Sequence, residues 1–184
     1  MPSLLAAVRE RLADRASAAS DPRVTVGHRV LAVEVEDPDH GELVGLAHRP
    51  RGTAAFDDAT VAGLVADATA AESPVRRAAG VAALNALSVP EVAWRRGDPM
   101  AGLPDDVSVV ATVGLFRPAF VKFDGVTVRA VERDPPDPAS VSTPPGVRVE
   151  TYAPEECARA FAGADVCFLT GSTLVYGGTD RYLR

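Results

Sequence analysis

Hydrophobic and polar positions near the start of the chain predict a helix followed by a β-hairpin. Over Ser3–Ala19, apolar residues recur at helical spacing with charges between them, which indicates a surface helix. Over Val30–Glu36 they alternate with polar residues, and after the turn-forming residues 37–41 a second β-like run covers Glu42–Ala47. These two runs predict a hairpin with one buried face.

Two further helices are predicted after the hairpin. Asp57–Ala71 is rich in alanine, which favours helix. In the second, Ser73 supplies an N-cap and Pro74 occupies the first helical position, so a helix opens there and extends to about Leu87. Helices and a hairpin in this order predict a small α+β domain, which we place at residues 1–100.

The pattern changes after Arg95–Asp106, a polar segment with Pro and Gly that is the predicted domain boundary. The next stretch, Val107–Pro118 (VSVVATVGLFRP), is a run of apolar residues that ends in Gly114, and Pro118 then opens a predicted helix. Uninterrupted apolar runs are typical of strands that are buried on both faces of a parallel sheet.

Strands and helices alternate from this stretch onward. The predicted strands are Val107–Val113, Val126–Val131, Val147–Tyr152 and Asp165–Leu169. The predicted helices are a short one from Pro118, one at about Pro154–Phe161 and one from about Ser172. This order predicts parallel strands joined by helices. The predicted fold class is therefore α/β, with the α+β domain followed by a Rossmann-like parallel sheet at residues 104–184.

Composition narrows the function classes. The chain has 184 residues, 47% of them hydrophobic, which is enough for a core. A net charge of −6 argues against nucleic acid or an anionic membrane as partner, and no apolar run approaches membrane-spanning length. Cys157 and Cys167 lie in segments expected to be buried and do not have zinc-ligand spacing. We expect a cytoplasmic protein.

The first candidate site is the turn after the first parallel strand. Gly114 is followed by Leu115, Phe116, Arg117 and Pro118, and the free amides of such a turn favour an anion. Arg117 adds a positive charge that can bind carboxylate or phosphate bidentately. The alternative is a tight turn with a surface arginine, because one glycine is not the three-glycine dinucleotide fingerprint.

The second candidate is Glu132, which follows strand Val126–Val131 and lies 18 residues after Gly114. Dinucleotide-binding proteins place an acid at about this distance, where it accepts hydrogen bonds from ribose hydroxyls. The alternative is a solvated acid that pairs with Arg129 or Arg133.

The third candidate is the segment Thr170–Thr173 (TGST), which offers hydroxyls, a glycine and a helix start. If the first and fourth parallel strands flank the switch point of the sheet, Gly114 and Gly171 face each other across one crevice. The alternative is that Ser172 or Thr173 only caps the helix that begins there.

Three segments in the second half, VATVGLFRPAF, VRAVERDP and ADVCFLTGSTLV, carry a resemblance to the Rossmann-like domain of the heavy-metal chelation family. In that family a domain similar to the enolase amino-terminal domain comes first, and VTVGHRVLAVEVE and GVAALNALS resemble it. The resemblance implies a ligand site in the cleft between the two domains. By position, the implied ligand-binding residues are Asn85, Gly114, Phe116, Arg117, Glu132, Thr170, Gly171, Ser172 and Thr173. Asn85, if buried, needs hydrogen-bond partners, either a ligand or another part of the domain.

The chain departs from the family in two places. It reads Tyr176-Gly-Gly-Thr179 where members usually have Asn-Gly-Thr, and it stops at Arg184 where the family's sheet continues. The strand Asp165–Leu169 would then be an apolar edge, and such edges invite pairing with another chain. We therefore expect a truncated or split product, or a homo-oligomer or partner chain that completes the sheet.

Three functions remain open from the sequence. The leading one is binding of a small anionic or metal-chelating ligand in the interdomain cleft, with a metal ion or metal chelate as the implied cofactor. The second is an enzyme that uses a nucleotide-type cofactor such as NAD or S-adenosylmethionine, with Glu132 on the ribose. The third is a non-catalytic interaction subunit.

Overall fold

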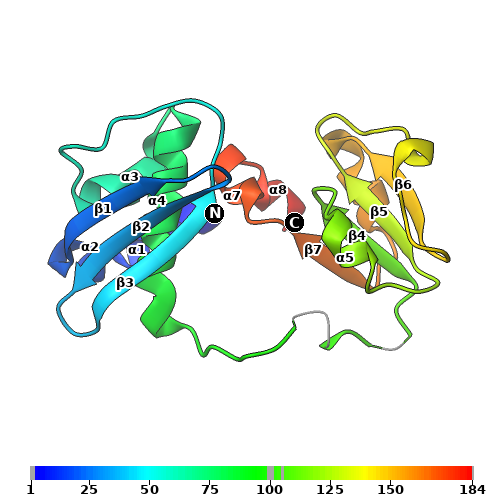
Figure 1. Cartoon of the computed structure of the whole chain (residues 1–184), viewed down its shortest axis with the longest axis horizontal. Coiled ribbons are helices and arrows are strands. Elements are labelled where there is room, and N and C mark those ends of the chain that lie inside the picture. The colour runs from blue at the N-terminus through cyan, green and yellow to red at the C-terminus, as the bar shows by residue number, and fades with distance from the viewer. Residues whose placement is uncertain (1–2, 99–101, 105, 184) are drawn as a thin grey trace. The chain divides into compact units, whose positions relative to one another are not determined.

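The computed structural model describes residues 3–98, 102–104 and 106–183. The chain divides into two compact units (Figure 1), the first made of Met1–Trp94 and Gly171–Arg184 and the second of Arg95–Thr170. The division predicted from the sequence put all of residues 104–184 in the second domain. The structure differs at the end of the chain, because the segment from Gly171 packs with the first unit.

The first unit contains an antiparallel sheet with the order β1-β2-β3. Its strands are β1 (Ser20–Val26), β2 (Val30–Asp37) and β3 (Gly41–His48), and its helices before the linker are α1 (Leu4–Arg11), α2 (Ala13–Ala18), α3 (Val61–Ala70) and α4 (Pro74–Ser88), followed by the 3-10 turn η1 (Val89–Glu91). The predicted hairpin is β2–β3. The predicted single helix over Ser3–Ala19 is two helices that meet at Leu12.

Helix α4 forms the centre of the first core and lies behind the sheet in Figure 1. Its buried face is built of small residues (Ala78, Ala79, Ala82, Ala83 and Ala86), all at 0% exposure. Small side chains let neighbouring backbones approach closely. A Cβ at Gly80 would lie 2.2 Å from the Ala68 nitrogen on α3, and one at Gly45 of β3 would lie 2.0 Å from the Ala82 oxygen.

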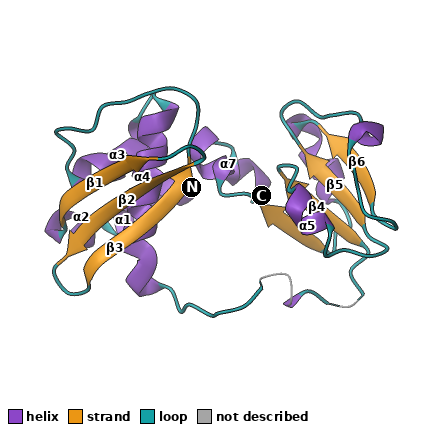
Figure 2. Cartoon of the chain, in the orientation of Figure 1, coloured by secondary structure: helices purple, strands orange, loops and turns teal. Residues whose placement is uncertain are grey.

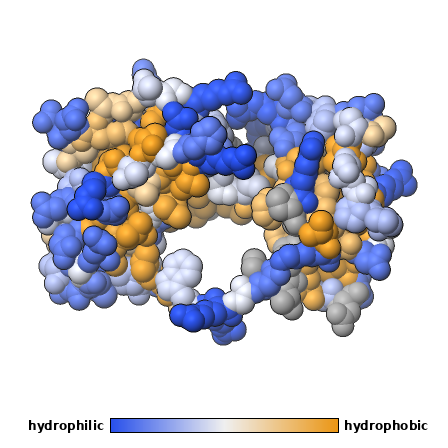
Figure 3. All heavy atoms as spheres, in the orientation of Figure 1, coloured by the Kyte–Doolittle hydropathy of each residue, from blue (hydrophilic) through white to orange (hydrophobic). Residues whose placement is uncertain are grey.

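One face of this sheet packs on α4 and the other is exposed. Along β3, Leu43, Gly45 and Ala47 are buried, whereas the alternate residues Val44 and Leu46 are 46% and 56% exposed. Hydrophobic residues accordingly gather on the visible face of the first unit in Figure 3. The alternation is what the sequence pattern predicted for a half-buried hairpin.

The second unit contains four parallel strands in the order β6-β5-β4-β7. They are β4 (Val109–Val113), β5 (Thr127–Val131), β6 (Arg148–Tyr152) and β7 (Val166–Leu169). An antiparallel sheet with helices followed by a Rossmann-like parallel sheet confirms the predicted fold class.

Short helices and turns connect the strands of the second unit (Figure 2). They include α5 (Arg117–Phe120), the 3-10 turns η3 (Pro138–Ser140) and η4 (Pro154–Glu156), and α6 (Cys157–Phe161). The short helix expected from Pro118 is the single turn α5, and the helix expected at about Pro154–Phe161 is η4 followed by α6. Phe120 and Phe123 pack with Val110, Val128 and Val149 in the second core.

The end of the chain forms two short helices, α7 (Ser172–Tyr176) and α8 (Thr179–Tyr182). Helix α7 contacts α4 and β3, and Val175, at 0% exposure, belongs to the first core. The carboxylate of Asp180 accepts a hydrogen bond from the Leu4 nitrogen at 2.8 Å. These contacts attach the last residues to the first unit.

Asp165 connects the amino ends of β4 and β7 and gives the second unit a pH dependence. Its Oδ2 accepts hydrogen bonds from the amides of Val109 (2.8 Å) and Ser108 (2.9 Å) and from the Ser108 hydroxyl (3.0 Å). The Val109 and Ser108 amides, with that hydroxyl, lower the pKa of Asp165. A lowered folded-state pKa adds stability above the unfolded-state pKa, and this stability is lost as pH falls through the folded-state value.

We therefore expect Asp165→Asn to reduce stability at pH 7 and to have little effect at a pH below the lowered pKa, where wild-type Asp165 is protonated. Urea titrations of both proteins across this pH range measure the difference. If the difference in unfolding free energy between the two proteins stayed constant with pH, the charge of Asp165 would contribute nothing to stability.

Candidate functional site

The carboxyl ends of β4, β5 and β7 meet at one edge of the parallel sheet. In the register of the sheet, Val113 of β4 lies opposite Val131 of β5 on one side and Leu169 of β7 on the other. The chain crosses from β4 to β5 in one direction and returns from β6 to β7 on the other side of β4. This reversal makes the end of β4 the topological switch point, where open α/β sheets bind ligands.

At the switch point the backbone of Gly114 runs against Thr170. Gly114 has a φ of 95°, and a Cβ there would lie 3.0 Å from both Cγ2 and Oγ1 of Thr170. The Gly114 amide donates to the Val131 oxygen at 2.9 Å, and the Thr170 amide donates to the Val113 oxygen at 3.3 Å. Only glycine suits this position, because the φ is left-handed and the space beside it is filled.

Glu132 closes the turn that follows Gly114. Its side chain is half-buried, and Oε1 accepts a hydrogen bond from the Leu115 amide. The sequence analysis expected the free amides of this turn to bind an anionic ligand, but the Leu115 amide already donates to the Glu132 carboxylate. The predicted alternative partner Arg129 instead pairs with Glu150, with its Nε 3.4 Å from Oε2. The contact between Glu132 and Leu115 was not predicted, since nothing in the local sequence indicates it.

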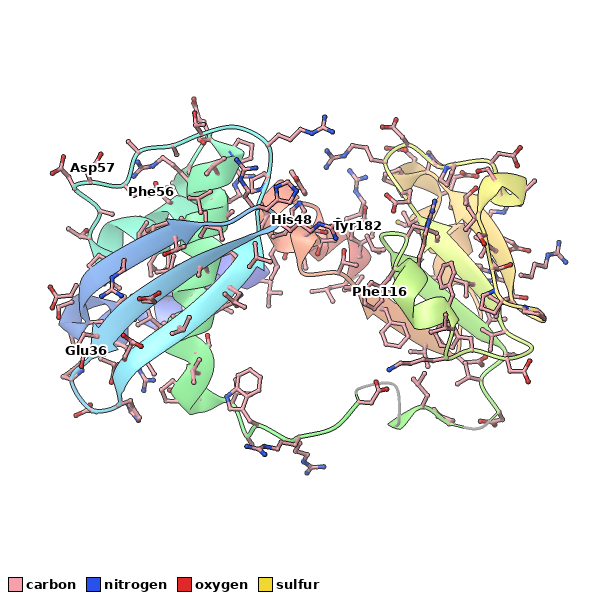
Figure 4. The ribbon with its side chains drawn as sticks, viewed as in Figure 1. Glu36, His48, Phe56, Asp57, Phe116 and Tyr182 are labelled. Atoms are coloured by element: carbon pink, nitrogen blue, oxygen red, sulfur yellow. The ribbon has the colours of Figure 1, made fainter. Side chains whose placement is uncertain are left out.

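Phe116 and Arg117 are the exposed side chains of this turn. Phe116 is 51% exposed and lies in the loop before α5 (Figure 4). Arg117 is also exposed, and within the described residues its side chain makes no hydrogen bond or ion pair. Helix α5 has only four residues, so its dipole adds little to anion binding. The positive charge beside this turn is therefore the Arg117 guanidinium and not a helix dipole.

Thr112 is a polar residue of this region that the sequence analysis missed. It is 3% exposed, lies on β4 two residues before Gly114, and its Oγ1 has no hydrogen-bond partner in the part of the chain that the structure describes. Buried hydroxyl groups without partners are uncommon. Threonine is a common residue in β-strands, so a threonine within an apolar run carries no sequence signal of a functional role.

The predicted segment Thr170–Thr173 spans the boundary between the two units. Thr170 belongs to the second unit, whereas Gly171, Ser172 and Thr173 belong to the first. Thr173 is 8% exposed, and its Oγ1 accepts a hydrogen bond from the Thr179 hydroxyl at 3.1 Å. Thr173 thus helps to hold α7 and α8 together inside the first unit, and Ser172, the first residue of α7, is half-buried.

Asn85 is exposed rather than buried. Its side-chain amide donates to the Leu46 oxygen of β3 at 2.8 Å, which connects helix α4 to this strand. This is the alternative that the sequence left open, a hydrogen bond to another part of the domain. Asn85 lies in the first unit and Gly114 in the second.

The described residues contain no group of three or more His, Cys, Asp or Glu side chains that could hold a metal ion. Both cysteines are free, and the expectation that they are buried was wrong: Cys157 is half-buried and Cys167 is exposed on β7. Partial desolvation still raises the pKa of the Cys167 thiol, which disfavours the thiolate that a soft metal needs. Among the described residues there is also no helix with the length and apolar character needed to cross a membrane.

Comparison with known proteins supports the fold. No family model matches the sequence, and no curated protein matches it. A solved structure from Pyrococcus horikoshii, a DUF364 family protein of unknown function, matches with a TM-score of 0.73 at 19% sequence identity. The match covers 98% of this chain and 73% of that one. At this identity the similarity shows the shared α/β fold alone, so neither metal chelation nor the enolase-like first domain is established by it.

Proposed function

We propose that this protein binds a small anionic ligand, free or as a metal chelate, at the carboxyl edge of its parallel sheet. The observation that supports this most is the switch point at the end of β4. There the turn after Gly114 presents Arg117, whose exposed guanidinium has no hydrogen bond or ion pair within the described residues. An arginine of this kind binds carboxylates or phosphates through two parallel hydrogen bonds.

A nucleotide cofactor fits this edge less well. The acid that would accept ribose hydroxyls, Glu132, has one carboxylate oxygen on the Leu115 amide. The pyrophosphate of a dinucleotide requires a glycine-rich turn and a long helix, but here there is one glycine and a four-residue helix. Glu132, beside this turn, has the chemistry of a general base, but its carboxylate already accepts the Leu115 amide, so the proposed function is binding and not catalysis.

Any metal ion in the proposed complex would be coordinated by the bound chelator and not by side chains of the protein. Without a three-residue ligand group in the described chain, a metal ion would be held by the oxygens of its own chelator. The protein would then bind the negative charge of the chelate. Citrate is a suitable probe because it is small, anionic and binds metal ions through its oxygens.

We expect Arg117→Gln to weaken citrate binding by about tenfold or more, the effect of losing a charge-assisted hydrogen bond. Isothermal titration calorimetry with citrate, alone and loaded with iron(III), measures this. Arg148→Gln is the matched control. It removes the same charge, but Arg148 is the first residue of β6 and so lies at the amino ends of the parallel strands, away from Arg117. Equal weakening in both variants would contradict a specific site, and so would wild-type protein that does not bind citrate.

A second function is favoured by strand β7, an edge of the parallel sheet whose residues Val166–Leu169 carry no charge. Edge strands without charged residues pair readily with other strands. We propose that a second copy or a partner chain pairs with β7. Native mass spectrometry of the purified chain reports its assembly and any retained compound together. A monomer would contradict pairing between copies, and a retained nucleotide would favour the cofactor-dependent alternative.

A further inference from the structure

A separate cavity of about 190 Å³ lies entirely within the first unit. It is formed by the start of α1, the end of α3, the first turns of α4, and the segment that contains α7 and α8. A single water needs only about 10–15 Å³ on the same measure, so the cavity has room for a small molecule. Its polar lining includes Thr69, Arg77, Thr173, Thr179 and Asp180.

Arg77 is the only arginine among the residues that line this cavity in the described chain, and its donors are incompletely used. Nη2 donates to the Ala71 oxygen at 2.8 Å, which fixes the guanidinium. The buried Nε has no hydrogen-bond partner in the described residues and no surface that a ligand could reach, so the donor available to the cavity is Nη1. The neighbouring Arg76 differs, because its Nε lies 2.8 Å from Oδ2 of Asp67. A partly buried guanidinium without a carboxylate is costly unless an anion pairs with it.

The backbone beside Arg77 is open to a ligand. Gly177 and Gly178 both have left-handed φ values, 80° and 100°, and carry no Cβ. A Cβ at Gly177 would lie 4.0 Å from Nη1 of Arg77, so this nitrogen lies directly beside the glycine backbone. The hydrogen-bonded hydroxyls of Thr173 and Thr179 add polar lining to the same cavity.

Asp180 restricts the charge that the cavity can accept. Its Oδ1 accepts a hydrogen bond from the Leu4 amide, and its carboxylate lines the same cavity as Arg77. The positive charge of Arg77 attracts one carboxylate, and the negative charge of Asp180 repels a dianion such as phosphate. The pair therefore favours a molecule that has one carboxylate and one hydrogen-bond donor. We infer that this cavity binds a small hydroxy- or amino-carboxylate, with the carboxylate on Arg77 and the donor group toward Asp180.

Titration of the full chain with L-lactate, L-alanine and inorganic phosphate tests this inference. We expect lactate or alanine to bind, and phosphate to bind more weakly than either. Tighter binding of lactate would identify the donor group as a hydroxyl, and tighter binding of alanine would identify it as an ammonium. Arg77→Gln is expected to weaken binding by about tenfold or more. Arg77→Lys keeps the charge but loses the planar fork, so it is expected to weaken binding as well.

Arg76→Gln is the control, since it removes the same charge one residue away, from a side chain that does not line the cavity. Circular dichroism establishes that each variant is folded. The inference is overturned if neither carboxylate binds to the wild type, if phosphate binds more tightly than both, or if Arg76→Gln weakens binding as much as Arg77→Gln. The cavity shares no residue with the turn at Gly114, so citrate binding and lactate binding can fail separately.

Discussion

Replacing Gly80 by alanine will destabilise the first unit by about 3 kcal/mol, at the upper end of the usual cost of overpacking a core. Alanine in place of glycine normally stabilises a helix interior by up to about 1 kcal/mol, so the expected effect has the opposite sign. The reason is contact with backbone. The added Cβ would lie 2.2 Å from the Ala68 nitrogen and 2.5 Å from the Leu64 oxygen, and neither atom can rotate away.

Urea denaturation followed by circular dichroism measures this loss. Gly171→Ala is the control, because a Cβ at Gly171 meets nothing within 4 Å and its φ is −59°, so we expect a change within about 0.5 kcal/mol. If Gly80→Ala were as stable as the wild type, helices α3 and α4 could not be as close as the structure places them.

Replacing Phe120 by alanine will destabilise the second unit by about 3–5 kcal/mol, the usual cost of deleting a buried aromatic side chain. Phe120 is 1% exposed, ends the single turn of α5, and packs in the second core with Val110 and Val128. Arg117 is the first residue of the same turn. Loss of this anchor will therefore also weaken ligand binding at the carboxyl edge of the sheet.

Amide hydrogen exchange over β4 and β5 measures the stability of the second unit by itself. Phe116→Ala is the matched control, because Phe116 precedes the same turn but is 51% exposed, and we expect it to change stability by less than about 1 kcal/mol. Equal effects of the two substitutions would mean that α5 is not anchored by Phe120.

The sequence predicted the elements that depend on local patterns. Ser73 and Pro74 open α4 as expected, with the Ser73 hydroxyl accepting from the Arg76 amide at 3.5 Å. The apolar runs predicted β4 and its parallel neighbours, because strands buried on both faces need such composition. Strand β1 was not predicted, since Asp21, Pro22 and Arg23 interrupt the hydrophobic pattern that marks a strand.

The sequence could not predict which distant groups pair. Of the predicted site residues, Gly114, Phe116, Arg117, Glu132 and Thr170 do lie at or beside the carboxyl edge of the sheet. Asn85 and Thr173, however, use their polar groups within the first unit, on Leu46 and Thr179. Such pairings depend on tertiary packing, and no periodicity or spacing in the chain encodes them.

The order of the two units along the chain has a consequence for biosynthesis. The first unit is discontinuous: its polypeptide is interrupted after Trp94 and resumes at Gly171. The second unit is therefore a domain insertion, and all of its strands leave the ribosome before α7 and α8 exist. Since domains fold as units while they are synthesised, the inserted sheet can form early, whereas the host domain cannot bury Val175 until its last segment emerges.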